Sequence, residues 1–250
     1  MPTYFDGQNL TDDAILTEEL MRSCTFGITN TRPVPDTLNM KDKDRFDYFT
    51  RNLQVTYPDS KSSTAMIIPN VVFHCDTFDH FKKTGVYIGV PQHWVDFIRT
   101  KLTSKGIITS FEDPGLSSDD KYWWTRQGFV PAEEGSEYIF VVDEDEEGNV
   151  VEDPFVSFPD MFRFVGASAI ANATCSIKMT SKLPKNSKGG WSGAEEWRMG
   201  ITVSRINVTD FIDIEKPRTT VSSRSVAGTK DKAKKRLLDR IRQNQEKYGA

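Results

Sequence analysis

One group of residues in this chain combines the side-chain types that bind single-stranded nucleic acid. In Tyr122-Trp123-Trp124-Thr125-Arg126, three aromatic side chains stand beside a cation. Bases of a single strand stack on exposed aromatic rings, and a neighbouring cation can hold a phosphate. Because adjacent residues of a strand point to opposite sides, we expect at least one ring to be exposed or to cover a sheet edge. The alternative is that the tryptophan pair closes one end of a small core.

A second group is a basic loop with two tryptophans, which we expect to join the last two strands. Its glycines would provide mobility and its lysines charge, and loops between strands are a usual nucleic-acid contact in small β-barrels. With one arginine further on, the candidate binding residues of this region are Lys178, Lys182, Lys185, Lys188, Trp191, Trp197, Arg198 and Arg205. The alternative is a solvated loop with Trp197 packed inward on the last strand.

Two clusters contain metal-ligating residue types without a recognisable spacing. Residues 74–80 include two His, one Cys and two Asp, but they match no closed zinc pattern, so we interpret them as polar residues at a strand end. The acidic residues 143–147 could hold Mg²⁺ for nuclease chemistry, yet they crowd one hairpin turn and are better explained as a solvated turn. No catalytic motif is present. We therefore predict no enzymatic activity, no catalytic residue, no metal site and no cofactor.

Composition and length predict one large domain with arms. The chain has 250 residues, of which 37% are hydrophobic, and a formal net charge of −4. No apolar run reaches the ~18 residues of a membrane helix, and the acidic N-terminus lacks a secretory signal. Cys24, Cys75 and Cys175 stand far apart, which favours reduced thiols. We expect a cytoplasmic protein without a membrane partner.

Charge is segregated along the chain. Residues 112–153 are strongly acidic, residues 221–250 are strongly basic, and the lysines and arginines of 178–205 lie between them. A local basic groove can therefore exist despite the negative total charge.

Alternating apolar residues predict the strands that must position these groups. We expect strands within Arg45–Tyr57, Thr64–Cys75, Val86–Val90, Ile107–Phe111, Tyr138–Val142, Val165–Met179 and Met199–Phe211, and a hairpin turn at Glu147-Gly148-Asn149. The clearest helix is Pro91–Ser104, with apolar residues at helical spacing and Gly106 beyond its end. A shorter helix is expected over Thr11–Met21 and a basic one over Thr229–Tyr248.

From Tyr138 to Phe211 the strand pattern resembles the C-terminal half of the single-stranded DNA-binding proteins of short-tailed T-odd coliphages. The matching residues are Val141, Val142, Asp143, Gly148, Glu152, Asp153, Gly166, Ala167 and Ser168, followed by Gly200 to Val208. This resemblance, which covers about 75 residues, implies an oligonucleotide/oligosaccharide-binding (OB) fold. Together with the strand pattern it predicts a mainly β protein, namely a five-stranded OB-fold Greek-key barrel with one packed helix, long loops and a C-terminal basic helix.

The expected organisation has three parts. Residues 1–44 are an N-terminal arm with a short helix, residues 45–216 are the OB-fold single-strand-binding domain, and residues 217–250 are a linker and the basic helix. The resembled proteins end in an acidic tail that recruits replication partners, so this basic end puts such recruitment in doubt. Residues 229–250 could instead bind nucleic acid, dock phage replication proteins or pair with another copy of the chain.

The function predicted from these patterns is non-enzymatic, sequence-independent binding of single-stranded DNA. The protein would protect or anneal strands in phage replication or recombination, in the cytoplasm of the host cell. Two alternatives stay open. One is a virion or transcription-associated interaction protein that uses an OB barrel without binding DNA, and the other is a metal-dependent nuclease.

Overall fold

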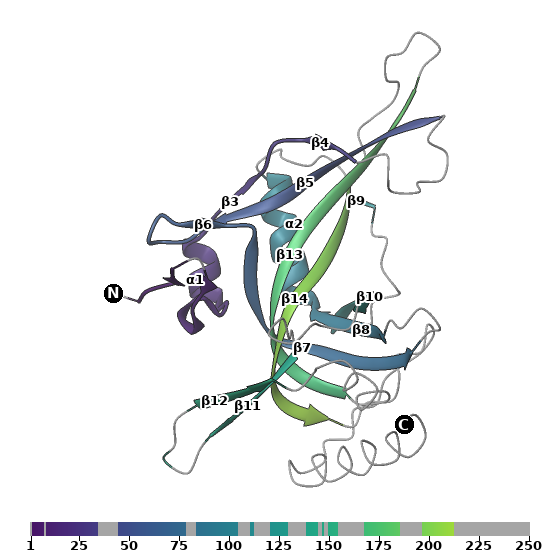
Figure 1. Ribbon diagram of the computed structural model, residues 1–250. Coiled ribbons are helices and arrows are strands. Elements are labelled where there is room, and N and C mark those ends of the chain that lie inside the picture. Colours follow the sequence, from purple (N-terminus) through teal and green to yellow (C-terminus); the bar gives the residue numbers. More distant parts are fainter. Residues whose placement is uncertain are drawn as a thin grey trace. The chain divides into compact units, whose positions relative to one another are not determined.

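The computed structural model describes residues 2–7, 9–34, 45–78, 84–104, 111–112, 121–129, 139–144, 147, 150–154, 168–185 and 197–212. These residues form a mainly β structure with two α-helices (Figure 1). The chain divides into two units. The first is formed by Met1–Ile67, Asp96–Pro114 and Cys175–Thr202, and the second by Ile68–Val95, Gly115–Thr174 and Val203–Ala250.

The first unit is organised around one long strand, β5 (Phe46–Thr56). Leu53 and Val55 on one side of β5 are buried, whereas Asn52 and Gln54 are exposed or half-buried and residues 46–51 are all half-buried. The partners of β5 are β3 (Thr25–Ile28), β4 (Arg32–Pro33), β6 (Ser62–Ser63) and β13 (Ser168–Pro184). A short strand, β9 (Phe111–Glu112), pairs in parallel with β14 (Trp197–Ile212).

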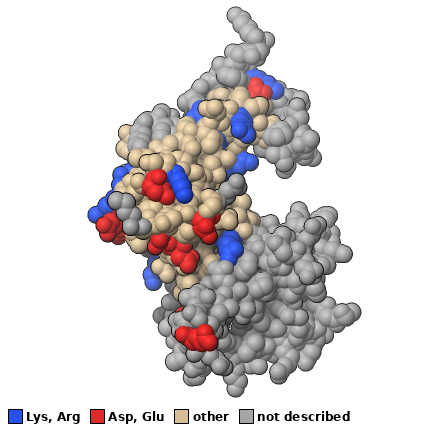
Figure 2. Space-filling view, turned by 60° about the vertical axis from the view of Figure 1, so that its left-hand side comes forward, with Lys and Arg blue, Asp and Glu red and all other residues tan. Residues whose placement is uncertain are grey.

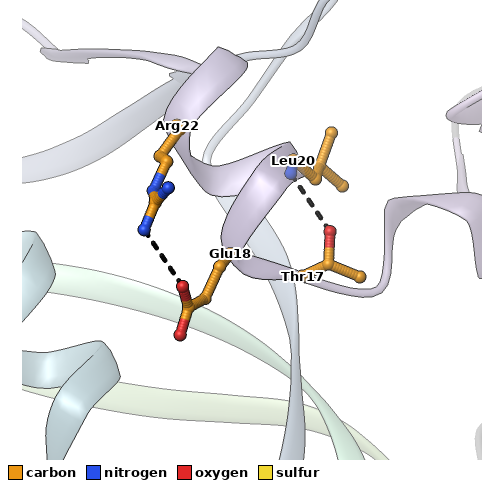
Figure 3. A network of polar contacts seen from close by, with 4 residues as sticks. All are labelled: Thr17, Glu18, Leu20 and Arg22. Carbon is orange, nitrogen blue, oxygen red and sulfur yellow. Dashed lines mark hydrogen bonds and ion pairs between the residues drawn. The ribbon is translucent and has the colours of Figure 1, made fainter.

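The N-terminal residues contain a shorter helix than the sequence pattern indicates. After the pair β1 (Phe5–Asp6) and β2 (Asn9–Leu10), a 3₁₀ helix covers Asp12–Ala14 and helix α1 covers only Glu18–Ser23. Between them the chain is extended, because Leu16 N donates to the Ile67 carbonyl oxygen at 2.9 Å. Thr17 Oγ1 accepts from Leu20 N at 3.1 Å and starts α1, and an Arg22–Glu18 ion pair of 3.1 Å spans its single turn (Figure 3).

The main path of the large sheet has the strand order β10-β8-β7-β13-β14-β11-β12. The expected hairpin is confirmed, since β11 pairs antiparallel with β12 and Asp143 lies opposite Val151. β11 also pairs in parallel with β14, with Ile139 opposite Ile206. The bounds of these strands are β7 (Ala65–Phe78), β8 (Thr84–Pro91), β10 (Tyr122–Phe129), β11 (Ile139–Glu144) and β12 (Val150–Pro154).

The helix expected over Pro91–Ser104 is confirmed as α2 (Gln92–Ser104). Its buried residues are Trp94, Val95, Ile98 and Leu102, which recur at helical spacing. In the described residues, no helix is long and apolar enough to cross a membrane.

A closed five-stranded barrel is not what the described residues form. Twelve strands join one mostly antiparallel sheet with β10 and β12 at the ends of its main path, and no ladder among the described strands joins these two. The physical reason is strand length, because β13 and β14 have 17 and 16 residues. Strands of that length exceed the roughly 5–6 residues of a typical strand, and their surplus pairs with β5 and β9. The expected N-terminal arm supplies β3 and β4 to the first unit, and residues 217–250 lie outside the described residues.

Two cysteines lie in the core as free thiols. Cys24 and Cys175 are both buried. Burial removes water from the thiolate form, which raises the pKa of Cys24 to about 11 and that of Cys175 to about 12.

The raised pKa of Cys175 predicts a loss of stability in alkali. An unfolded chain releases this proton near pH ~8.5, so the stabilising contribution is fully present below that pH and is lost as pH rises toward the folded pKa of about 12. We expect the free energy of unfolding to fall more steeply between about pH 9 and 11 in the wild type than in Cys175→Ala. Urea unfolding at several pH values measures both slopes, and equal slopes would contradict the burial of this thiol.

Candidate nucleic-acid interface

The aromatic cluster at the start of β10 belongs mainly to the core. Trp123 is 1% exposed and Trp124 is 4% exposed, while Tyr122 is half-buried and its ring centroid lies 5.9 Å from that of Trp124. A base cannot stack on a ring that solvent does not reach, so Trp123 and Trp124 are corrected from binding to packing residues. Both are buried because both faces of β10 are covered at this point. Arg126 lies opposite Tyr87 in the β10–β8 ladder, and its side chain lies outside the described part.

Trp124 packs against a glycine of the neighbouring strand. Gly89 lies opposite Trp124 in the β10–β8 ladder. A Cβ atom built on Gly89 would stand 2.9 Å from Cη2 and from Cζ3 of the Trp124 ring. Only the absence of a side chain at Gly89 leaves room for this ring.

Gly89→Ala is therefore expected to lower the free energy of unfolding by about 1–3 kcal/mol, the usual cost of overpacking a core. Gly27→Ala in β3 is the matched control, because no atom lies within 4 Å of a Cβ built there. Denaturant midpoints of the two variants measure the difference. If both substitutions were equally tolerated, the described packing of Trp124 would be wrong.

The alternation along β13 divides the candidate lysines between two faces. Residues at odd positions from 169 to 183 are buried, whereas Lys178 is exposed and Lys182 is half-buried. These two lysines share one face, and a separation of four residues on a strand corresponds to about 13 Å. Lys185 behaves differently, since its Nζ lies 3.1 Å from Oδ1 of Asp47, which is opposite Leu183 on the other face. The structure therefore brings Lys178 and Lys182 together and turns Lys185 away.

Strand β5 supplies aromatic and polar residues to the face of Lys178 and Lys182. In the antiparallel β13–β5 ladder, Lys178 lies opposite Asn52 and Lys182 opposite Tyr48. Directly opposite residues point to the same side of a sheet. The Lys182 ammonium also lies 3.7 Å from the centroid of the Phe46 ring. Tyr48 and Phe46 are both half-buried.

Two arginines complete this face. Arg32 of β4 is exposed and lies opposite Thr50, which in turn lies opposite Thr180 of β13. A Cβ built on Gly200 of β14 would stand 3.7 Å from the Lys178 carbonyl oxygen, which places β14 beside β13 at this level.

Arg198 precedes Gly200 by two residues, is exposed, and therefore shares its side of β14. We call Arg32, Tyr48, Lys178, Lys182 and Arg198 the basic face. On the side of the molecule shown in Figure 2, basic side chains are intermixed with acidic ones. Strand register places Arg32, Tyr48, Lys178 and Lys182 on the basic face. The alternation of burial along β14 places Arg198 there, opposite Glu112 of β9.

The remaining predicted residues do not join the basic face. Trp197 is 2% exposed, and the Arg51 guanidinium carbon lies 4.1 Å from its ring centroid, so Trp197 is corrected to a core residue. This is the inward packing that the sequence left open as an alternative. Arg205 lies in the second unit, where its Nε donates to Asn207 Oδ1 at 2.9 Å. Lys188 and Trp191 lie outside the described residues.

Sequence reasoning missed Arg32, Phe46 and Tyr48. Phe46 and Tyr48 fell within the predicted strand Arg45–Tyr57, at the start of the expected barrel. Side chains alternate between the two faces of a strand, and Phe46 and Tyr48 are an odd number of residues away from Leu53 and Val55. This spacing was the available signal that they lie on the other side of β5. Arg32 carried no signal, because its place depends on pairing with Thr50.

The metal-ligating types show no clustering in the part of the chain that is described. His74 is buried, and its Nδ1 lies 2.6 Å from Ser168 Oγ within the second unit. A search of the described residues finds no group of three or more His, Cys, Asp or Glu that could hold a metal ion. Asp79 and His80 lie outside these residues, as do Asp145 and Glu146.

Comparisons with known proteins found no match for this chain. No protein-family model matches the chain, and neither a curated protein nor a solved structure shows significant similarity to it.

Proposed function

We propose that this protein binds single-stranded DNA across the basic face, without catalysing a reaction. The observation that carries the proposal is the strand register, which puts Lys178, Lys182 and the half-buried Tyr48 on one side of the sheet. Cations spaced along strands can neutralise successive phosphates, and an aromatic ring between them offers a stacking surface. Contacts of these two kinds do not read base edges, so binding is independent of sequence.

We further propose that the second-unit parts of five strands form an OB-type barrel. An OB barrel is five-stranded and partly open. The series β10-β8-β7-β13-β14 has this number of neighbouring strands. Its two outer members are linked by a side chain, because Gln127 Nε2 donates to the Val203 carbonyl oxygen and Val203 N donates to Gln127 Oε1, both at 2.8 Å. This pair of bonds supports a curled sheet whose seam is bridged by an amide side chain.

The biological setting remains part of the proposal. The resemblance carried by Tyr138–Phe211 favours a role in phage replication or recombination, in the cytoplasm of a host cell. The second candidate partner surface is 229–250, for phage replication proteins or another copy of the chain, and it lies outside the described residues.

The test is a titration of the full chain with fluorescently labelled poly-dT and with a mixed-sequence strand. We expect similar affinities for both strands, and a slope of log affinity against log salt of about −2 to −3 if three or four cations each neutralise one phosphate. Absence of binding at low salt would favour an interaction protein instead. Strand cleavage that requires Mg²⁺ and stops with a chelator would favour a nuclease.

A further inference from the structure

A pocket of about 210 Å³ lies in the first unit where the β3–β4 connection meets β5. Arg32 and Arg51 line it, and the other lining residues are all threonine or asparagine. Among the described residues, the lining therefore contains no carboxylate, and Arg32 and Thr50 lie on the same side of β5. The Arg32 guanidinium favours an anion here, because it offers a fork of N–H donors that matches the oxygens of a phosphate.

The wall of this pocket is held in place before any ligand binds. Asn52 N donates to Thr29 Oγ1 and Thr29 N donates to the Asn52 carbonyl oxygen, each at 2.9 Å. Arg51 Nε donates to Thr31 Oγ1 at 2.6 Å while its guanidinium rests on the Trp197 ring. A pre-formed wall loses little conformational freedom when a ligand binds.

One hydroxyl in the wall is buried without a partner. Thr50 Oγ1 has no hydrogen-bond partner within the described part of the chain, although solvent hardly reaches it. Buried polar atoms are nearly always hydrogen-bonded, so an orphaned hydroxyl in a pocket wall points to a bound group that supplies the partner. A phosphate oxygen would accept the Thr50 hydrogen.

We propose that this pocket binds one phosphate group, held by the Arg32 guanidinium and the Thr50 hydroxyl. The volume equals about seven waters at ~30 Å³ each and is below the ~300 Å³ at which pockets enclose whole small molecules. A phosphate with part of its sugar fits, and a complete nucleotide does not. Arg32 belongs to the pocket and to the basic face, and Thr50 pairs across from it. The inference therefore rests on the proposed function for the source of the phosphate, a strand lying on that face.

The first arm of the test uses inorganic phosphate and the full chain. Phosphate is titrated at constant ionic strength while the amide NMR signals of Thr29, Thr50 and Asn52 are followed. We expect saturable shifts, weakened about tenfold or more by Thr50→Val, which keeps the shape of the side chain but removes a hydrogen bond to a charged group. Lys185→Gln is the control, since Lys185 also carries a positive charge but lies off the basic face beside Asp47 and does not line the pocket.

The second arm uses thymidine oligonucleotides with and without a 5′-phosphate. If Thr50→Val weakens the binding of both oligonucleotides equally, an internal phosphate occupies the pocket. If it weakens only the binding of the 5′-phosphorylated oligonucleotide, a terminal phosphate does. Both results support the inference. Unchanged amide signals with phosphate, together with full oligonucleotide affinity in Thr50→Val, would overturn it while leaving the proposed function standing. If the protein bound inorganic phosphate saturably but did not bind oligonucleotides, the pocket would be a site for free phosphate, and the proposed DNA-binding function would be rejected.

Discussion

Trp197→Ala is expected to lower the free energy of unfolding by about 3–5 kcal/mol, the usual cost of truncating a buried tryptophan. Trp197 is 2% exposed and supports the Arg51 guanidinium at 4.1 Å. The substitution would therefore leave a cavity in the first unit and remove the surface against which Arg51 is packed. Urea unfolding followed by circular dichroism measures the change without depending on the number of tryptophans.

The matched variant is Trp191→Ala, which changes the other tryptophan of the same predicted loop. From the sequence we expect Trp191 to stack on a base, so its loss should cost about 1–3 kcal/mol of binding and little stability. Comparing the stability and the DNA affinity of these two variants separates a packing role from a binding role for two tryptophans that are close in the sequence. A Trp197→Ala protein with wild-type stability and lost affinity for poly-dT would show that the ring is a stacking residue after all.

Lys178→Gln combined with Lys182→Gln is expected to weaken binding to poly-dT about 25-fold at roughly 0.1 M salt. Each lysine that neutralises a phosphate contributes about −0.7 to the slope of log affinity against log salt for a single strand, and this contribution vanishes near 1 M salt. The double variant should thus also flatten the slope by about 1.4. Fluorescence anisotropy titrations at several salt concentrations measure both quantities.

Lys185→Gln is the control for this pair of lysines. It removes the same charge from the end of the same strand, but Lys185 is turned to the other face and lies 3.1 Å from Asp47. Its substitution should change affinity only slightly, and its exposed ion pair adds little stability. If Lys185→Gln weakened binding as much as the other two substitutions together, binding would not depend on which face of the strand a lysine occupies. The residues assigned to the basic face would then be wrong.

Local sequence patterns were sufficient for several elements. Helix α2 could be predicted because Trp94, Ile98 and Leu102 recur at helical spacing after Pro91. The β11–β12 hairpin could be predicted because two alternating segments flank a turn containing Gly148. Such signals reach over only a few residues, so long-range contacts do not overrule them easily. The Thr11–Met21 helix failed where a long-range contact did intervene, at the Leu16–Ile67 hydrogen bond.

The sequence by itself thus determined that the protein is mainly β, that a helix follows Pro91, and that cations and aromatic residues are concentrated in a few segments. Only the tertiary structure decided which of these residues act together. A shift of one residue in strand pairing moves a whole set of side chains to the opposite face, and no local pattern shows the register that places Lys182 beside Tyr48 and Lys185 beside Asp47. Burial is decided in the same way, because Trp123 and Trp124 can both be covered only when other parts of the chain pack on the two faces of β10.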